Sequence, residues 1–566
     1  MKKFKLSWVY WISLFFYFVQ FPNLSTAAEL TPEARLAQMS LEQKVGQLFI
    51  IGFPQTEMDQ KLKTHLQKNN FSSFLLFKRN IVNPKQIVNL NTSLHRLSQE
   101  NTGSVPLIAV DQEGGFVNRI PLRPSVPHAI SLGLSRSTSI SYSLGDEIGR
   151  ILSSLGFNMN LAPVLDLADI KKKSFIGVRS FGSNPTWVAQ LGSAYSMGLL
   201  KNNVIPTAKH FPGLGDIPQD PHLVSIVRQN STKELVEKDF FPFKTYAKIN
   251  GEKAIMLSHM IYPQLDDRKV PASFSRVIIH NWLRQNLGFN GVIMTDDLHM
   301  KASTDSSPVD EGAVRALEAG VDMIMLSWSF AEQEKTVNRI LSAYKSARLS
   351  LAELDEKVLR ILRMKMFIAQ KAFSPTLYSE SIISSSQLNN IEYHLFKTKL
   401  DQLQNLTGLA KDKQICVYSS QNLFATQMRI YSKIPLRTFQ IHPQLNASTL
   451  ERSLQSNACQ LNILTLYNWS QAQLAVNLPA SIQKHILVVN FSSVAFLRDS
   501  TEFLARLEAL SPYSQAGRDL ALFLNEKVST SLPAIPSPLG LAQSHGVGVQ
   551  NSRHPSSQKP ISARPD

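Results

Sequence analysis

Eight short apolar runs alternate with helical patterns between about residue 40 and residue 330, and this alternation restricts the fold more than any other feature. Near-continuous apolar runs are typical of parallel strands that are buried on both faces. Strands that alternate with helices indicate βαβ units. The runs, rich in Val, Ile, Leu and Met, are 47–53, 73–77, 106–111, 157–166, 204–211, 254–259, 291–297 and 321–327.

Eight such units predict an α/β fold with a (β/α)₈ TIM-type barrel, although an open doubly wound sheet has the same alternation. The positions of polar residues favour the barrel. In a barrel the carboxyl ends of all strands meet at one face, which carries the active site, whereas in an open sheet they spread along an edge. The residues that end or follow the runs are Asp111, Asp166, Lys209, His210, His259, Asp296 and Asp297.

The rest of the chain divides by composition. The barrel domain is expected at 29–372, and the polar, Ser-rich stretch 373–392 is interpreted as a linker. Further apolar runs separated by helical patterns predict a smaller α/β domain at 393–540. The tail, 541–566, has too few apolar residues to form a core and is expected to be disordered.

The first 28 residues have the pattern of a signal peptide: a basic start, an apolar stretch at 8–21, and small residues at 25–28. The apolar stretch is shorter than the roughly 20 residues that span a membrane. We therefore expect export to the periplasm or the extracellular space, without stable membrane insertion after cleavage. An uncleaved anchor is the less favoured alternative.

Lys and Arg exceed Asp and Glu by 16, which favours anionic partners or simply a basic, solvated surface. We prefer the second interpretation, without a nucleic-acid partner, because no basic run is longer than 171–173. The two cysteines, Cys416 and Cys459, form a disulfide or remain two separate thiols, and the sequence leaves both possibilities open.

The loop KHFPGLGDIPQDPH (209–222) gathers several titratable residues. Asp220 precedes a proline, which favours extended backbone, and residues two apart in an extended segment point to the same side. Asp220 is therefore expected to bond one ring nitrogen of His222 and leave the other free to exchange a proton. The alternative is an exposed pair in a turn. Asp216, Asp220, His210 and His222 have no standard metal spacing, so no metal and no cofactor are predicted.

Asp296 and Asp297 end the seventh run, where a carboxylate can act as nucleophile, base or metal ligand. Successive residues of a strand point to opposite faces, so only one of the two is expected to face the barrel axis. The alternative is that both cap the following helix. A nucleophilic carboxylate opposite a proton donor is the equipment for retaining glycoside hydrolysis. Histidine is an unusual donor there, but its proton affinity suits the role.

Eight motifs match a known family in order, over roughly residues 40 to 300. The sequence resembles family 3 glycoside hydrolases of the β-N-acetylglucosaminidase type. The spacing from KHFPG to D-x-H separates this branch from the β-glucosidases and xylosidases of the superfamily. The C-terminal region resembles the αβα sandwich of two-domain members. The motifs are MSLEQKVGQLFIIGF, FLLFKRNI, PLIAVDQEGGFVNRI, NLAPVLDL, GVRSFGSNP, AKHFPGLGD, DPH and GVIMTDDLHM.

The resemblance implies a role for each matching residue. Asp296 matches the catalytic nucleophile, His222 the general acid/base, and Asp220 the partner that orients it. The remaining matches imply binding of the sugar, which suits side chains that offer charged, directional hydrogen bonds. For Arg179, Lys209 and His210 the alternative is a network that ties strand ends together. The implied sugar-binding residues are Asp111, Arg119, Arg179, Lys209 and His210.

Three positions depart from the family pattern. Phe116 stands where arginine is frequent, Leu214 replaces a usual histidine, and Pro221 replaces a small residue inside the Asp-His pair. Pro221 is expected to stiffen a loop that is mobile in the family. These changes bear on the leaving-group preference and the rate rather than on the reaction type.

The sequence as a whole predicts an exported, exo-acting, retaining β-N-acetylhexosaminidase that removes terminal N-acetylglucosamine from peptidoglycan fragments or chitooligosaccharides. One alternative is a phosphorylase with the same site, because a histidine acid/base does not repel an incoming phosphate as a carboxylate does. The other is a non-catalytic glycan-binding protein. Neither the oligomeric state nor the function of the C-terminal domain can be predicted from the sequence.

Overall fold

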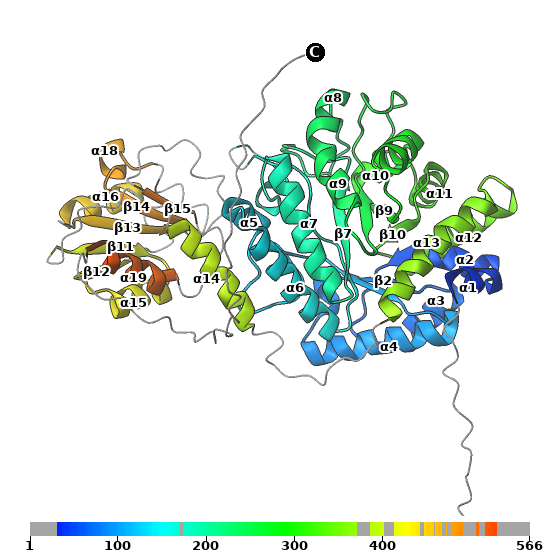
Figure 1. Cartoon of the computed structure of the whole chain (residues 1–566), viewed down its shortest axis with the longest axis horizontal. Coiled ribbons are helices and arrows are strands. Elements are labelled where there is room, and N and C mark those ends of the chain that lie inside the picture. Colours follow the sequence, from blue (N-terminus) through cyan, green and yellow to red (C-terminus); the bar gives the residue numbers. More distant parts are fainter. Residues whose placement is uncertain are drawn as a thin grey trace, which may run out of the picture.

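The computed structural model describes residues 31–370 apart from 170, 171 and 173, and, further along the chain, 385–400, 413–441, 446–457, 459–466, 471, 475, 477–490, 505–508 and 516–528. Two bodies are visible in Figure 1: a larger one with a ring of helices and a smaller one with a sheet between helices. The predicted signal peptide (1–28) and the predicted tail (541–566) lie outside the described residues.

The larger body is a closed parallel barrel with the strand order β1-β10-β9-β8-β7-β6-β3-β2. β1 pairs with both β2 and β10, which closes the sheet and excludes the open alternative. Each of the eight predicted runs contains one strand, so the predicted barrel is confirmed. The strands are β1 (Phe49–Ile51), β2 (Ser73–Leu76), β3 (Leu107–Val110), β6 (Met159–Asn160), β7 (Ile205–Phe211), β8 (Ala254–Leu257), β9 (Val292–Asp297) and β10 (Met323–Leu326).

Helices surround the barrel, and one continuous apolar core fills the space between them and the strands. Several helices begin where the sequence supplies a side-chain cap, such as Asn83 and Asn184, each followed by a proline at the first helical position. The helices are α1 (Pro32–Gln38), α2 (Leu41–Gln47), α3 (Gln60–Lys68), α4 (Pro84–Thr102), α5 (Ala129–Ser135), α6 (Thr138–Ser154), α7 (Pro185–Lys201), α8 (Thr232–Glu234), α9 (Phe240–Ala247), α10 (Lys301–Thr304), α11 (Val309–Ala319), α12 (Phe330–Lys345) and α13 (Leu351–Ala369).

A small antiparallel hairpin, β4 (Gln112–Gly114) and β5 (Val117–Asn118), follows β3 directly. Its turn uses Gly115 at a φ of +56°, and a Cβ there would lie 1.9 Å from the Nδ1 atom of His128. Glycine is therefore required both by the backbone conformation and by the space. The hairpin turns the chain back over the barrel mouth, and it carries Glu113.

The smaller body is a five-stranded parallel sheet with the order β12-β11-β13-β14-β15 and helices on both faces, as predicted for an αβα sandwich. Alternate residues of a strand enter two separate apolar cores, such as Val417 on one face and Tyr418 on the other. The strands are β11 (Ile415–Ser419), β12 (Leu436–Gln440), β13 (Leu461–Leu466), β14 (Ile486–Asn490) and β15 (Ala505–Glu508). The helices are α14 (Ser386–Leu400), α15 (Asn422–Tyr431), α16 (Ala447–Ser456), α18 (Ala480–Gln483) and α19 (Ala516–Val528).

The predicted linker needs a correction at its end. Residues 386–392 are the first turns of α14, which packs against α6 and α5 of the barrel domain. Ser385 accepts a hydrogen bond from the Leu388 N–H (3.0 Å) and donates one to Glu147 of α6 (2.5 Å). This serine therefore caps a helix and anchors it to the barrel. Residues 373–384 lie outside the described residues.

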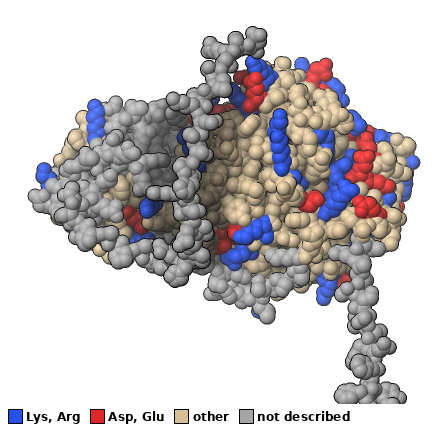
Figure 2. Space-filling view, viewed as in Figure 1, with Lys and Arg blue, Asp and Glu red and all other residues tan. Residues whose placement is uncertain are grey.

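Cys416 of β11 and Cys459, just before β13, form a disulfide, which decides between the two possibilities that the sequence left open. On the face shown in Figure 2, basic and acidic side chains are interspersed over the barrel domain. In the part of the chain that the structure describes, no helix is both long enough and apolar enough to cross a bilayer.

Candidate active site

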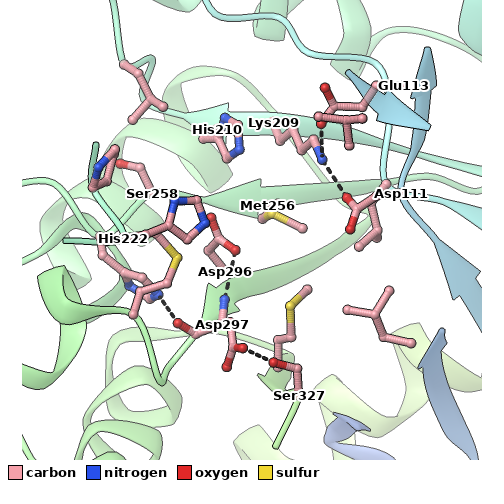
Figure 3. Close-up of a pocket in the computed structure, with 18 of the residues that line it drawn as sticks. Asp111, Glu113, Lys209, His210, His222, Met256, Ser258, Asp296, Asp297 and Ser327 are labelled. Carbon is pink, nitrogen blue, oxygen red and sulfur yellow. Dashed lines mark hydrogen bonds and ion pairs between the residues drawn. The ribbon is translucent and has the colours of Figure 1, made fainter. Parts of the chain in front are cut away.

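A pocket of about 450 Å³ opens at the carboxyl ends of the barrel strands, and we call it the barrel pocket. Its described lining belongs entirely to the barrel domain and comes from the ends of β2, β3, β6, β7, β8, β9 and β10 and the loops after them. In Figure 3, Asp296 lies between His222 on one side and Asp111 with Glu113 on the other. The predicted site residues that line the pocket are Asp111, Arg119, Arg179, Lys209, His210, Asp220, His222 and Asp296, which is all of them.

Five charged side chains form a continuous row along one wall, which we call the charged row: Arg119, Asp111, Lys209, Glu113 and Arg179. Lys209 Nζ lies 2.8 Å from Asp111 Oδ1 and 2.7 Å from Glu113 Oε1. Arg179 donates two hydrogen bonds of 2.8 Å to the two oxygens of Glu113. Arg119 Nη2 lies 3.7 Å from Asp111 Oδ2. Glu113, which the sequence patterns did not indicate, therefore connects Arg179 to Lys209. Asp111 contacts Lys209 and Arg119 directly.

The contacts in the charged row favour the ionised forms of Glu113 and Lys209. Burial raises the pKa of Glu113, but Arg179 and Lys209 lower it more, and the net pKa lies far below the usual range. Burial lowers the pKa of Lys209, and Asp111 and Glu113 outweigh that effect and raise it. A desolvated row of fixed charges offers strong hydrogen bonds to hydroxyl groups, because there is little water to compete.

Asp296 and Asp297 both line the barrel pocket, but their carboxylates have different partners. The register between β9 and β10 shifts at this point, which breaks the simple alternation. Asp296 Oδ1 accepts the Asp297 N–H at 2.8 Å. The Asp297 carboxylate instead accepts hydrogen bonds from Ser327 and from His299. Asp297 is thus held by protein groups.

Asp296 is poised as an anion. Burial raises the pKa of its carboxyl, but the nearby His210 and His259 and the Asp297 N–H lower it more, and the net pKa lies below the ordinary value. His210 itself is tied to Asp166, with Nδ1 at 2.6 Å from Oδ2. An ionised carboxylate that is open to the pocket is the form that attacks an electrophilic carbon.

His259 also lies close to Asp296, and both of its ring nitrogens have hydrogen-bond partners. Its Nε2 atom lies 3.2 Å from the carbonyl oxygen of Asp297, which can only accept a hydrogen bond, so the proton is on Nε2. Its Nδ1 atom then accepts a hydrogen bond from Ser273 at 2.8 Å. Burial lowers the pKa of this imidazole. His259 therefore supports the end of β9 and is not placed to shuttle a proton.

Asp220 and His222 are in contact as predicted, but the backbone between them is not extended. Asp220 Oδ1 accepts two hydrogen bonds from His222, one from the backbone N–H (2.8 Å) and one from Nδ1 (2.6 Å). The Leu223 N–H also bonds the Asp220 carbonyl, which makes residues 220–223 a turn with Pro221 at its second position. The local turn of an aspartate side chain, rather than strand alternation, brings the pair together.

This turn lies against the loops of neighbouring strands. The Lys301 N–H, just after β9, donates to the His222 carbonyl at 3.3 Å, and the Phe175 ring lies 5.8 Å from the His222 ring. The His222 side chain remains 56% exposed. It can therefore exchange protons with water while its Nδ1 atom is held by Asp220, which leaves Nε2 as the working nitrogen.

The arrangement combines an ionised carboxylate, an oriented imidazole and a row of charged hydrogen-bonding groups in one pocket. These are the parts needed to hold a polyhydroxylated ring, attack its reactive carbon and protonate a leaving oxygen. Among the described residues, no group of three or more His, Cys, Asp and Glu is arranged to hold a metal ion.

Comparison with known proteins identifies the family. Residues 40–364 match the glycosyl hydrolase family 3 N-terminal domain, which is more than half of the chain. The chain belongs to glycosyl hydrolase family 3. The matched residues contain the whole described lining of the barrel pocket.

Curated proteins and solved structures are also similar to the chain. The chain is 35% identical over 287 residues to a β-hexosaminidase of Nitrosomonas eutropha, covering 49% of this chain and 79% of the relative. It is 28% identical over 408 residues to β-hexosaminidase A of Pseudoalteromonas piscicida, covering 67% and 68%. The solved structure of a family 3 β-N-acetylglucosaminidase from Paenibacillus sp. str. FPU-7 matches with a TM-score of 0.74 and 26% identity, covering 87% of this chain and 97% of that one.

The three departures from the family 3 pattern have different positions. Phe116 is 71% exposed at the hairpin tip, with its ring edge against His128, and it does not line the barrel pocket. Leu214 and Pro221 are buried and do line it. The Leu214 N–H donates to Asp166 Oδ1 at 2.7 Å, so its backbone, not its side chain, supports the His210 partner.

Proposed function

We propose that this family 3 chain is an exo-acting, retaining β-N-acetylhexosaminidase. The observation that carries the proposal is the shared pocket of Asp296, an ionised carboxylate, and the Asp220–His222 pair, an oriented proton donor and acceptor. Both curated relatives described above are named as β-hexosaminidases. Asp296 belongs to the end of β9 and the Asp220–His222 pair to the loop after β7, so only the fold brings them to the same substrate.

In the first step, Asp296 attacks the anomeric carbon and the glycosidic bond breaks. His222, protonated on both nitrogens, transfers the Nε2 proton to the leaving oxygen. Asp220 holds the Nδ1 proton throughout, so that the same nitrogen always faces the substrate. The products are a glycosyl ester on Asp296 and the free leaving sugar.

In the second step, neutral His222 accepts a proton on Nε2 from a water molecule, and the resulting hydroxide oxygen attacks the anomeric carbon. The ester bond to Asp296 breaks, and the carboxylate returns as the leaving group. Two inversions give overall retention of the β configuration. The exposure of His222 allows water to reach this nitrogen once the leaving sugar has departed.

The charged row is proposed to bind the hydroxyls of the sugar that is transferred. Arg119 Nε is buried and has no hydrogen-bond partner among the described residues, so it is available to a hydroxyl. Asp111 accepts hydrogen bonds and Lys209 donates them. Asp111, Arg119, Lys209, Arg179 and His210 would together place the anomeric carbon against Asp296.

The substrates proposed are glycans that end in β-linked N-acetylglucosamine, such as peptidoglycan fragments or chitooligosaccharides. The predicted signal peptide supports hydrolysis of these glycans outside the cytoplasm, in the periplasm or the extracellular space. Muropeptides or chitin fragments would be accessible to the enzyme in those compartments. No nucleic-acid partner is proposed.

The direct test is hydrolysis of 4-nitrophenyl N-acetyl-β-glucosaminide by the mature protein, beside the matching β-glucoside and in the presence and absence of phosphate. We expect turnover of the amino sugar alone, with free N-acetylglucosamine as the product. Formation of the sugar 1-phosphate would make the chain a phosphorylase. Binding of N-acetylglucosamine without turnover of any substrate would make it a glycan-binding protein.

A further inference from the structure

We propose that Trp328 forms the binding surface for the leaving sugar, a pyranose whose apolar C–H face stacks on the indole. The inference rests on the proposed function and extends it, because it concerns the half of the substrate that departs. Trp328 lines the barrel pocket and is 52% exposed. A large aromatic side chain so exposed beside a pocket is a candidate for ligand contact, since such rings are otherwise mostly buried.

The Trp328 indole is held in place by its neighbours. The guanidinium carbon of Arg79 lies 3.9 Å from the centroid of the indole and 4.2 Å from that of the Phe77 ring. Arg79 is itself fixed by hydrogen bonds to two backbone carbonyls, those of Ser327 (2.9 Å) and Phe53 (3.2 Å). Arg79 thus supports the indole, and a surface that is already rigid loses little entropy when a ligand binds.

The backbone at Trp328 is also fixed relative to the reacting groups. Gln333 donates to the carbonyls of Leu326 (3.2 Å) and Trp328 (3.4 Å). The hydroxyl of Ser327, the preceding residue, donates to Asp297, which follows the proposed nucleophile. Figure 3 shows Ser327 next to Asp297 and away from Glu113 and Lys209. The indole therefore has a defined position at the pocket, apart from the charged row.

The two kinds of surface suit the two halves of a disaccharide. The charged row offers hydrogen bonds to hydroxyls and suits the sugar that is transferred to Asp296. Trp328 offers a broad apolar face with high contact area and few rotatable bonds. Such a face binds a sugar ring without a hydrogen bond to each hydroxyl. A binding site for the leaving sugar needs this weaker hold, because the sugar must dissociate after the glycosidic bond breaks. An aromatic leaving group such as nitrophenol would stack there too, so it cannot test the proposal alone.

The test compares two substrates that share the transferred sugar. N,N′-diacetylchitobiose has a pyranose leaving group, whereas N-acetyl-β-glucosaminyl fluoride has a leaving group without a ring. In Trp328→Ala we expect kcat/KM for the disaccharide to fall roughly 5- to 10-fold and kcat/KM for the fluoride to stay within about twofold. Trp328→Phe should keep most of the disaccharide activity. Phe241→Ala, an exposed aromatic outside the pocket lining, should change neither value.

An equal fall for both substrates, or no fall for either, would overturn the leaving-sugar role of Trp328. If Trp328→Ala does not fold, binding of the disaccharide by Asp296→Asn and by Asp296→Asn with Trp328→Leu, which keeps an apolar side chain without an aromatic face, replaces the kinetic comparison. Equal affinities would then count against the proposal. If the unmodified protein hydrolyses neither substrate, the proposed function itself fails, which is distinct from a failure of the subsite alone.

Discussion

Asp220 and His222 share one carboxylate oxygen: Asp220 Oδ1 lies 2.6 Å from Nδ1 of His222 and 2.8 Å from its backbone nitrogen. A single oxygen thus fixes both the ring orientation and the turn that presents the ring. Removing its negative charge is expected to affect proton transfer more than folding, because the turn lies on an exposed loop and an amide oxygen can still accept the backbone N–H.

The first prediction follows from this contact. Asp220→Asn should lower kcat/KM for the disaccharide by about 10²-fold, because the amide no longer stabilises the imidazolium that protonates the leaving oxygen. The β-fluoride, which needs no such proton, should lose far less. Asp216→Asn, in the same loop and outside the pocket lining, is the matched control and should leave both rates unchanged. A uniform loss on both substrates would mean that Asp220 only supports the loop.

The second prediction concerns Glu113, which neutralises two buried cations. Glu113→Gln should lower the free energy of unfolding by about 3–5 kcal/mol, because Arg179 and Lys209 would remain buried without this partner. Denaturant unfolding monitored by circular dichroism measures the loss. Glu100→Gln, which breaks an exposed pair with Arg96, should cost far less, since exposed pairs are screened by solvent. Comparable losses in the two variants would contradict the importance of the charged row.

The pH dependence of the Glu113 effect has a defined sign. The pKa of Glu113 is depressed on folding, from an unfolded value of about 4.3. Its stabilisation is therefore complete above that value and is lost as the pH falls toward the folded pKa. Glutamine does not titrate, so the gap in unfolding free energy between wild type and Glu113→Gln should be constant near neutrality. It should narrow below about pH 4, and a gap that widens in acid would contradict this account.

The third prediction uses the disulfide. Replacing both Cys416 and Cys459 by alanine removes a link across 43 residues and should destabilise the C-terminal domain by roughly 2–4 kcal/mol. Activity at moderate temperature should persist, because the described lining of the barrel pocket belongs to the barrel domain. Calorimetry of the variant, and of the wild type with and without reductant, measures the unfolding transitions of the two domains separately. Loss of activity in parallel with the C-terminal transition would show that this domain completes the site.

The barrel could be predicted because each of its strands has a recognisable pattern in the sequence. Strands buried on both faces must be apolar almost throughout, so a charged residue at the end of a run, such as Asp111 or Asp296, marks where the strand leaves the core. The same pattern predicts, from the sequence alone, that the polar groups lie together at the carboxyl ends of the barrel strands. Trp328 directly follows the eighth run, in the same kind of position as these polar groups. Its apolar side chain does not mark the end of a buried strand, so it could not be singled out from the sequence.

Other features depended on local geometry that residue periodicity does not contain. Glu113 was missed although it lies two residues after Asp111, the spacing that puts side chains on one side of an extended segment. The Asp220–His222 contact was predicted for the wrong reason, because the proline makes a turn and not an extended segment. The start of α14 could not be predicted, because Ser385, which caps this helix, is one more polar residue in a Ser-rich stretch.

The central claim is that Asp296 forms a covalent bond with the sugar. The most direct test treats the protein with a 5-fluoro N-acetylglucosaminyl fluoride, whose ring fluorine slows release of the intermediate, and maps the label by mass spectrometry. The account predicts one glycosyl unit on the peptide that contains Asp296, no label in Asp296→Asn, and a β-anomer as the first product from a natural substrate. A label on another residue, or an α-anomer as the first product, would contradict it.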